Sequence, residues 1–197
     1  MTMRRLFIAV DLAIPVVERL ALLQDEVQNR LEEKWEGKVR LRRVQAPNIH
    51  ITLKFIGDTA PELVPMIHAL LEKLCEPLFP FEVECLGVGV FPEPGRPRIL
   101  WAGLDEKSAE VLGLLQTALE RDLHKLGLEK ESRPYRPHVT LARVKTRSAP
   151  SFEELIADYG DVSFGKSYIK DLILYESHLD SAGARYEVVH RYSLGSA

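Results

Sequence analysis

The chain has 197 residues and a net charge of −3, with 46% hydrophobic and 28% charged residues. These values are typical of a globular protein, so they exclude a disordered chain and argue against a protein that coats nucleic acid by charge alone. Cys75 and Cys85, the two cysteines, are too few for a disulfide framework and favour a reducing compartment.

The sequence predicts no segment that enters or crosses a membrane. No stretch approaches the roughly 18 uninterrupted apolar residues that a spanning helix requires. The opening arginines are followed by apolar residues, but Asp11, Pro15 and Glu18 interrupt that run, which argues against a signal peptide. We therefore expect a cytoplasmic protein.

The first half of the chain predicts a strand, a long helix and a second strand. Residues 6–10 form an apolar strand, and the helix that follows has apolar residues at spacings of three and four: Val16, Leu20, Leu23, Val27 and Leu31. A basic connection leads to a strand that begins at His50 and ends at a Gly57-Asp58 turn. A shorter helix over 61–74 and a β-rich segment over 81–91 follow.

The second half repeats this plan after a turn-rich loop over 92–97. Residues 99–102 predict a strand, and the next helix has one apolar stripe: Leu112, Leu115, Leu119, Leu123 and Leu126. Another basic connection leads to a strand over 138–144. A helix over 151–157 and a β-rich segment over 168–175 follow, and a last strand over 186–194, without a counterpart, would close a sheet.

This repetition predicts an α+β fold with two pseudo-symmetric lobes, in which antiparallel sheets are flanked by helices. Because no Ser/Gly linker or charge block separates the halves, we expect a single bilobal domain over 1–197, with approximate halves 1–91 and 92–197. A central cleft between the lobes is the expected site, since ligands commonly bind between such units.

One four-residue phrase occurs in both halves, as His50-Ile51-Thr52-Leu53 and His138-Val139-Thr140-Leu141. In a strand, residues i and i+2 lie on the same face, so each phrase places a histidine and a threonine together, with apolar residues on the opposite face. Two such strands facing each other would surround one small anion with two imidazoles and two hydroxyls.

These residue types predict acid–base chemistry at a phosphate. Histidine has an ordinary pKa near 6.5, so one imidazole can be neutral and accept a proton while the other is protonated and donates one. The threonine hydroxyls can donate hydrogen bonds to phosphate oxygens as charge builds there, and Arg136 could add a charge-assisted contact. Basic residues also precede and follow both phrases, over 38–54 and 130–147.

The sequence gives no sign of a metal or a nucleotide cofactor. There is no H-E-x-x-H motif and no acidic cluster beside either phrase, so His50 and His138 could bind zinc only with unidentified partners. P-loop and G-x-G-x-x-G motifs are also missing. Of the remaining histidines, we expect His68 and His124 at the surface or core edge and His190 to be structural. His178 follows a strand, and a place near the cleft is the less favoured of its two interpretations. Phe7 and Trp101 are interpreted as core residues that could also offer a ring to a base.

The chain resembles the bacterial and archaeal 2'-5' RNA ligase family, also described as RNA 2',3'-cyclic phosphodiesterases, within the two-histidine phosphoesterase superfamily. The resemblance lies in RRLFIAVDL, NIHITLKFIGD, FPEPGRPRILWAGL, RPYRPHVTLARVK and LYESHLDSAGARYEVVHRYSL, in that order over nearly the whole length. One departure is the lead-in 43–48, which lacks the tryptophan often found there in relatives.

The resemblance implies a bilobal α+β fold and metal-independent opening of a 2',3'-cyclic phosphate to a 2'-phosphate, without a cofactor. By matching positions, it implies His50 as proton donor to the 3' oxygen, His138 as proton acceptor from water, and Thr52 and Thr140 as phosphate ligands, with Arg136 as a further contact. It also implies reversible 2'-5' joining of RNA, in which an RNA 5'-hydroxyl replaces water.

The expected partner is RNA with a 2',3'-cyclic phosphate end, such as a tRNA half, and we expect a monomer without a membrane or an obligate protein partner. Three alternatives stay open. The substrate could be a small cyclic nucleotide or an ADP-ribose cyclic phosphate. The chain could be a non-catalytic module that binds RNA ends, or a metal-dependent hydrolase.

Overall fold

The computed structural model describes residues 2–93, 96–146, 150–179 and 184–195. The strands are β1 Arg4–Asp11, β2 Val39–Arg43, β3 His50–Thr59, β4 Phe81–Phe91, β5 Ile99–Leu104, β6 Val139–Thr146, β7 Ser163–Ile169, β8 Asp171–Leu179 and β9 Ala184–Ser193. The α-helices are α1 Ile14–Trp35, α2 Val64–Cys75, α3 Glu106–His124 and α4 Glu153–Tyr159, with 3-10 turns at Ala46–Asn48 and Pro61–Leu63. The expected α+β class is confirmed.

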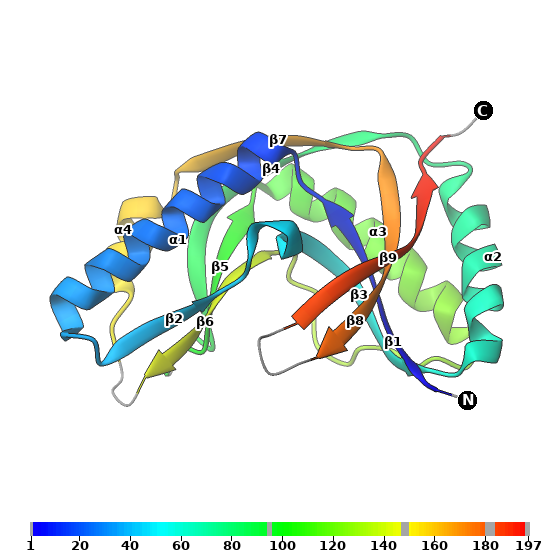
Figure 1. Cartoon of the computed structure of the whole chain (residues 1–197). Coiled ribbons are helices and arrows are strands. Elements are labelled where there is room, and N and C mark those ends of the chain that lie inside the picture. The colour runs from blue at the N-terminus through cyan, green and yellow to red at the C-terminus, as the bar shows by residue number, and fades with distance from the viewer. Residues whose placement is uncertain (1, 94–95, 147–149, 180–183, 196–197) are drawn as a thin grey trace.

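The strands form one curled antiparallel sheet with a symmetric order. Eight strands follow the path β7-β4-β5-β6-β3-β1-β8-β9, and β2 pairs with β6 beside it. The centre of this path is the contact between β6 and β3, which carry the two His-x-Thr phrases. Outward from it, β5 corresponds to β1, β4 to β8 and β7 to β9 (Figure 1). The last strand, expected to lack a counterpart, therefore corresponds to β7.

The two sides of this symmetric sheet do not coincide with the sequence halves 1–91 and 92–197. Strand β4, from the first half, pairs with β5 and β7 of the second half. Strand β8, from the second half, pairs with β1 of the first. Each side of the sheet is therefore built from both halves of the chain, which ties the two sides together covalently.

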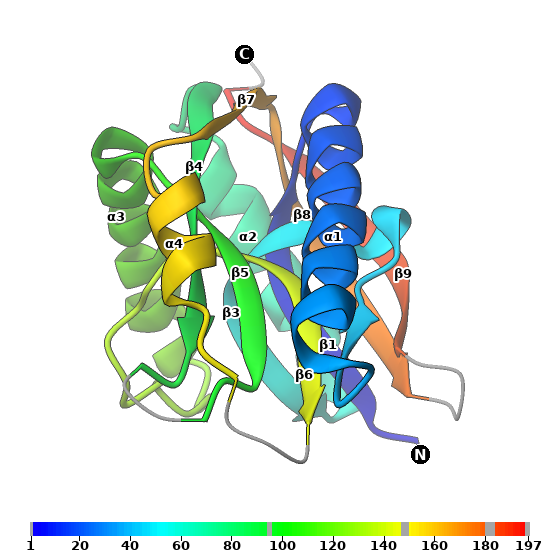
Figure 2. The same cartoon turned by 90° about the vertical axis from the view of Figure 1, so that its left-hand side faces the viewer.

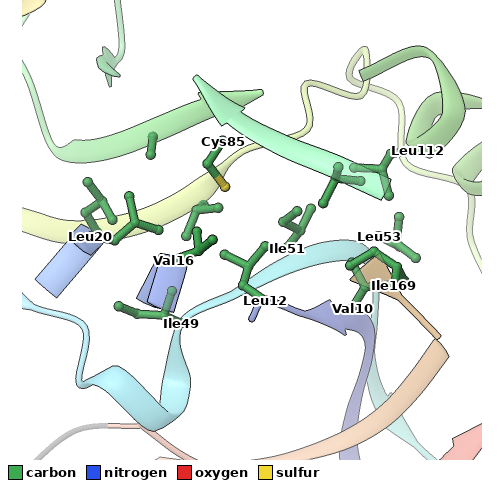
Figure 3. Packing of buried hydrophobic residues seen from close by; sticks show 14 of the residues in the cluster. Val10, Leu12, Val16, Leu20, Ile49, Ile51, Leu53, Cys85, Leu112 and Ile169 are labelled. Carbon is green, nitrogen blue, oxygen red and sulfur yellow. The ribbon is translucent and has the colours of Figure 1, made fainter. Parts of the chain in front are cut away.

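The helices cover one face of the sheet, here called the helix face, and one core lies between them and the strands (Figure 2). Strand residues such as Val10, Ile51 and Leu53 belong to this core together with Val16 and Leu20 of α1 (Figure 3). The stripe predicted for α1 is the buried face of that helix, and so is the α3 stripe from Leu112 to Leu123, whereas Leu126 lies beyond the end of α3. Among the described residues, no helix is long and apolar enough to cross a membrane.

Two local expectations were wrong, and one predicted β-rich segment is divided between two strands. The Gly57-Asp58 turn is part of β3, which continues to Thr59; Gly57 has a φ of 83° beside a register shift against β1. Residues 39–43, interpreted as a connection, form β2. The β-rich segment 168–175 spans the end of β7 and most of β8, which break at Lys170.

Candidate active site

The two His-x-Thr phrases lie side by side at the centre of the sheet. Strands β3 and β6 pair through Ile51 and Val139, both fully buried on the helix face. Continuing this antiparallel register places His50 alongside Thr140, and Thr52 alongside His138. The four polar side chains therefore point to the opposite face of the sheet, here called the site face, and all four are half-buried.

A backbone carbonyl orients each imidazole in the same way. The Nδ1 atom of His50 lies 2.8 Å from the carbonyl oxygen of Asn48, and that of His138 lies 2.7 Å from the carbonyl oxygen of Arg136. Because a carbonyl oxygen can only accept, Nδ1 carries a proton in both rings and Nε2 is the atom available for chemistry. Nε2 of His50 lies 2.9 Å from the Thr52 hydroxyl oxygen, which can donate to it.

Both imidazoles have lowered pKa values, for the same main reason. Burial disfavours the charged ring and is the largest cause at each site, whereas the bond from Nδ1 to the carbonyl opposes it. The pKa of His50 is also raised by the charge of Asp11 and lowered by that of His138. His138 is thus close enough for its protonation to disfavour that of His50, which is the relation required of an acid and base pair.

Aromatic rings pack around each imidazole from its own side of the sheet. His50 lies 5.1 Å from the ring centre of Phe7 and 5.4 Å from that of Tyr186, and Tyr175 stacks on Phe7 at 5.1 Å. Around His138, Phe91 makes an edge contact at 5.2 Å. Trp101 lies 6.3 Å away. Phe7 and Tyr175 form a small second core on the site face. These rings restrict the imidazoles and supply the burial that lowers their pKa values.

In both strands, the pairing register shifts at the last residue of the phrase, and this shift changes the face on which the following side chains lie. In β3, Ala9 pairs with Thr52 but Ile8 pairs with Lys54; in β6, Trp101 pairs with Thr140 but Leu100 pairs with Ala142. The extra residue, Leu53 or Leu141, is a bulge. As a result, Phe55 and Arg143 follow their threonines on the site face. The positive charge of Arg143 opposes the rise that burial causes in the pKa of Tyr186, so Arg143 reaches toward the His50 side.

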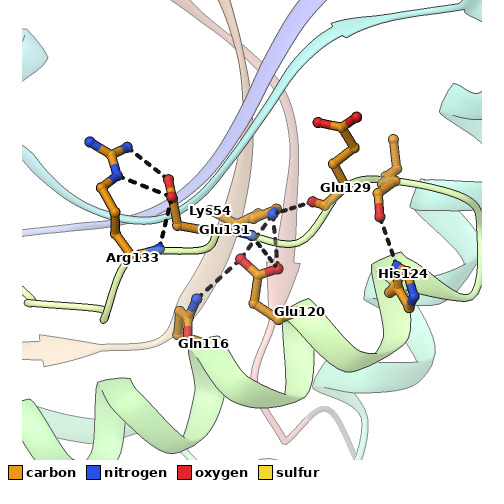
Figure 4. A network of polar contacts seen from close by, with 8 residues as sticks. Lys54, Gln116, Glu120, His124, Glu129, Glu131 and Arg133 are labelled. Carbon is orange, nitrogen blue, oxygen red and sulfur yellow. Dashed lines mark hydrogen bonds and ion pairs between the residues drawn. The ribbon is translucent and has the colours of Figure 1, made fainter.

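The bulge in β3 also turns Lys54, the last basic residue of the stretch 38–54, away from the site. Lys54 is buried on the helix face, where its Nζ donates to Glu120 Oε2 at 2.9 Å and to the Glu129 carbonyl at 2.7 Å (Figure 4). Glu120 also accepts from the backbone N–H of Glu131. This network holds the segment that leads into β6 against α3, and so positions the second phrase.

A group of basic side chains lies on the site face beyond the second phrase. Arg42 is opposite Arg143, and Arg40 is opposite Lys145, on the paired strands β2 and β6. All four are exposed, and among the described residues none of them forms an ion pair. We call these four residues the basic ladder. Two other basic residues of the stretches 38–54 and 130–147 are neutralised, since Arg43 pairs with Asp25 and Arg133 pairs with Glu131. Arg147 lies outside the described residues.

Asp11, at the end of β1, is a residue that sequence reasoning did not assign to the site. It is opposite His50 in the register, and its carboxylate accepts from the Tyr175 hydroxyl at 2.6 Å and from Arg191 at 3.0 Å. In the sequence, Asp11 is an acidic residue directly after the apolar run 6–10, and this position could have indicated a site residue. Phe55 and Arg143 had no such signal, because their orientation depends on the two bulges.

Among the other predicted residues, Arg136 is exposed and contributes its carbonyl to His138. His178 lies on β8 with Nε2 3.5 Å from Glu187, and no described contact joins it to either imidazole. Within the described residues, no third histidine, cysteine or carboxylate completes a three-ligand metal group with His50 and His138. The arrangement therefore offers two Nε2 atoms and two hydroxyls on one face of the sheet.

The chain is similar to several curated RNA 2',3'-cyclic phosphodiesterases. It is 31% identical to that of Aquifex aeolicus, over 87% of this chain and 91% of the relative. It is 33% identical to that of Aeropyrum pernix, over 92% of this chain and 98% of the relative. It is also 33% identical to that of Archaeoglobus fulgidus, over 93% of this chain and 96% of the relative.

Solved structures share the fold over almost the whole chain. TT0787 of Thermus thermophilus matches with a TM-score of 0.75 at 28% identity, covering 97% of this chain and 98% of that one. LigT of E. coli in its apo form matches with a TM-score of 0.75 at 21% identity, covering 98% and 99%. The model of the 2'-5' RNA ligase superfamily matches residues 23–180. The chain belongs to the 2'-5' RNA ligase superfamily.

Proposed function

We propose that this protein hydrolyses the 2',3'-cyclic phosphate ends of RNA to 2'-phosphates by metal-independent acid–base catalysis. His138 takes a proton from water as the water oxygen attacks phosphorus, and His50 gives a proton to the 3' oxygen as its bond to phosphorus breaks. The observation that carries the proposal is the pair of imidazoles on adjoining strands, each with Nδ1 bound to a carbonyl and Nε2 available on one face. The names of the relatives support the same activity.

Thr52 and Thr140 are the proposed phosphate ligands, with Arg136 as a further contact. Register places each threonine beside the histidine of the other phrase, so a phosphate between the imidazoles would lie within reach of both hydroxyls. Hydroxyl donors aimed at the non-bridging oxygens stabilise the charge that builds there in the transition state. The exposed Arg136 guanidinium could add charge-assisted bonds.

The basic ladder and Phe55 favour an RNA strand over a small cyclic nucleotide as substrate. The four exposed cations of the basic ladder form no ion pair with another described residue, and they match a chain of phosphates that continues from the reacting end. Phe55 is 68% exposed on the site face, whereas Phe7 is 1% exposed, so Phe55 is the ring available for stacking on a base.

The main test is incubation of the protein with an oligonucleotide that ends in a 2',3'-cyclic phosphate, in the presence of EDTA. We expect complete conversion to a 2'-phosphate, identified by phosphorus NMR. A 3'-phosphate product would contradict the proposed leaving group. Loss of activity in EDTA, restored by a divalent metal, would indicate a metal-dependent hydrolase, and binding without turnover would indicate a module that only recognises RNA ends.

Substrate length is tested by comparing kcat/KM for an oligonucleotide, a cyclic mononucleotide and an ADP-ribose cyclic phosphate. The variant Arg40→Gln/Arg42→Gln should reduce kcat/KM for the oligonucleotide and flatten its salt dependence, but leave the mononucleotide unaffected. Lys107→Gln on α3 is the matched control, because it removes one exposed cation from the helix side. If Arg40→Gln/Arg42→Gln changed kcat/KM equally for all three substrates, the result would favour a small-molecule substrate.

The assignment of acid and base is tested with a substrate whose 3' oxygen is replaced by sulfur. A thiol has a pKa near 8.5, so a thiolate leaves without a proton donor. His50→Ala should therefore regain most of its activity on this substrate, and His138→Ala should not. Rescue of His138→Ala instead would exchange the two roles.

Joining of RNA through a 2'-5' bond is the second activity that we propose, supported by the superfamily to which the chain belongs. In this step an RNA 5'-hydroxyl takes the place of water: its oxygen bonds to phosphorus, its proton goes to His138, and the bond from phosphorus to the 3' oxygen breaks as His50 protonates that oxygen. Supplying tRNA halves without ATP should give a joined product that depends on both histidines. We also propose that the protein acts as a cytoplasmic monomer, which sedimentation at several concentrations would test.

A further inference from the structure

A second histidine cluster lies between α2 and β9, away from the two phrases. His68 and Glu72 are one turn apart on α2, and His190 is on β9. One ligand atom from each of the three residues lies within 4.8 Å of those of the other two, and His68 Nε2 is 3.8 Å from Glu72 Oε1. The sequence does not predict this group, because His68 and His190 are far apart in the chain.

The cluster has the chemistry of a transition-metal site. Two imidazoles and one carboxylate are a common ligand set for zinc, and a helical i, i+4 pair places two of them on one side of the helix. A surface cavity of about 510 Å³ borders Glu72 and His190, so water can complete the coordination. Lys73 and Arg191 also border this cavity, but Arg191 is bound to Asp11.

A buried tyrosine fixes the orientation of one ligand. His68 Nδ1 lies 2.6 Å from the hydroxyl oxygen of Tyr192, which is 3% exposed and held in the main core. When Nδ1–H donates to this oxygen, the lone pair of Nε2 faces Glu72. An outer partner that sets the tautomer and angle of a ligating histidine is characteristic of metal sites. The rings of His68 and His190 are already in contact, with centres 4.4 Å apart.

We propose that His68, Glu72 and His190 bind a divalent transition metal, with zinc as the best match, and that this metal fastens α2 to the edge strand β9. The site is separate from the proposed chemistry at His50 and His138, so its role is in stability and it is independent of the proposed function.

The experiment uses the full chain without a histidine tag, stripped with EDTA and then dialysed. Titration with zinc chloride should give one bound zinc per chain by calorimetry, and a Tm higher by about 5 °C or more at a hundredfold excess over Kd. His68→Ala and His190→Ala should each abolish both effects. Tyr192→Phe should keep the site but raise Kd by about 10- to 100-fold.

The exposed His124 on α3 provides the control, since His124→Ala removes a histidine outside the cluster and should bind zinc like the unaltered chain. Cyclic-phosphate opening by His68→Ala in EDTA should match that of the unaltered chain, which separates this site from the catalytic one. Absence of bound zinc, or equal binding by His68→Ala, His190→Ala and the unaltered chain, would overturn the proposal.

Discussion

Strands β3 and β6 carry the same phrase, but their surroundings differ in charge and enclosure. His50 has Asp11 opposite it in the register and a threonine hydroxyl at Nε2, and it packs among Phe7, Tyr175 and Tyr186. His138 contacts Phe91 and Trp101, and among the described residues no carboxylate shifts its pKa. Beyond the bulges, the aromatic Phe55 on β3 corresponds to the cationic Arg143 on β6.

This difference shows how a duplicated motif can perform two tasks. The phrase itself supplies what the two sides share, namely an oriented imidazole and a neighbouring hydroxyl. The neighbours supply what must differ, because an acid has to hold a proton that a base has to lack. A negative charge near His50 favours its protonated form, which agrees with the proposed role as proton donor.

Replacing either histidine should have the largest effect on activity. His50→Ala and His138→Ala should each reduce kcat by about 100- to 10,000-fold, because each removes one proton transfer. The double variant should lose less than the product of the two effects, since the histidines act as a pair. Single-turnover rates with a cyclic-phosphate oligonucleotide measure this, and circular dichroism checks folding. Turnover near the original level in either variant would contradict the assignment.

The two threonines should differ in a second, smaller effect. Thr52→Val and Thr140→Val should each reduce kcat by about 10- to 100-fold, because each removes a hydrogen bond to a charged phosphate oxygen. Only Thr52 has a described bond to an imidazole, so only Thr52→Val should also alter the pH profile. Serine at each position keeps the hydroxyl and serves as control. A pH profile that changes equally in both valine variants would show that the two sides are equivalent.

Gly89 tests the aromatic packing on the His138 side. A Cβ there would overlap the indole of Trp101, lying 2.7 Å from Cε2 and closer to two other ring carbons. Gly89→Ala should therefore displace Trp101 and destabilise the protein by about 1–3 kcal/mol, as overpacking does. Urea unfolding measures the loss. Gly113→Ala on α3 has open space at its Cβ and is the control. An unchanged unfolding midpoint in Gly89→Ala would mean that the ring can move freely.

Much of this arrangement followed from patterns that are local in the chain. The alternation in the two phrases placed His50 and Thr52 on one face, and the apolar spacing located α1 and α3. The bulges at Leu53 and Leu141 were not predictable, because they depend on how each strand pairs with its neighbour. Without the bulge, Lys54 would be counted among the basic residues near the site. Its actual partner, Glu120, lies 66 residues further along the chain, so the sequence did not indicate this contact.

The sequence did not predict strand β2, nor did it predict that β4 and β8 join the side of the sheet built mainly from the other half of the chain. The short segment 39–43 is mostly basic, and its strand character comes from pairing with β6 across about a hundred residues of chain. Sequence repetition suggested one lobe per half, but it carries no information on which edge of the sheet a later strand joins. Long-range pairing decided both features.

Asp11→Asn gives the smallest and most discriminating effect, because it removes the charge that distinguishes the two histidines. The negative charge of Asp11 raises the pKa of His50, so its loss should lower that pKa. With His50 as acid, activity requires its protonated form, and the alkaline limb of the kcat/KM profile should move to lower pH. Movement of the acidic limb instead would identify His50 as the base.

The control for this prediction is Tyr175→Phe, which removes the hydroxyl that bonds to Asp11 but keeps the carboxylate charge. Its profile should keep both limbs in place, with at most a uniform loss of rate. If Asp11→Asn and Tyr175→Phe shift the same limb equally, the hydrogen bond and not the charge sets the difference between the sides. If neither shifts a limb, the asymmetry of the two histidines must come from the bound phosphate and its leaving oxygen.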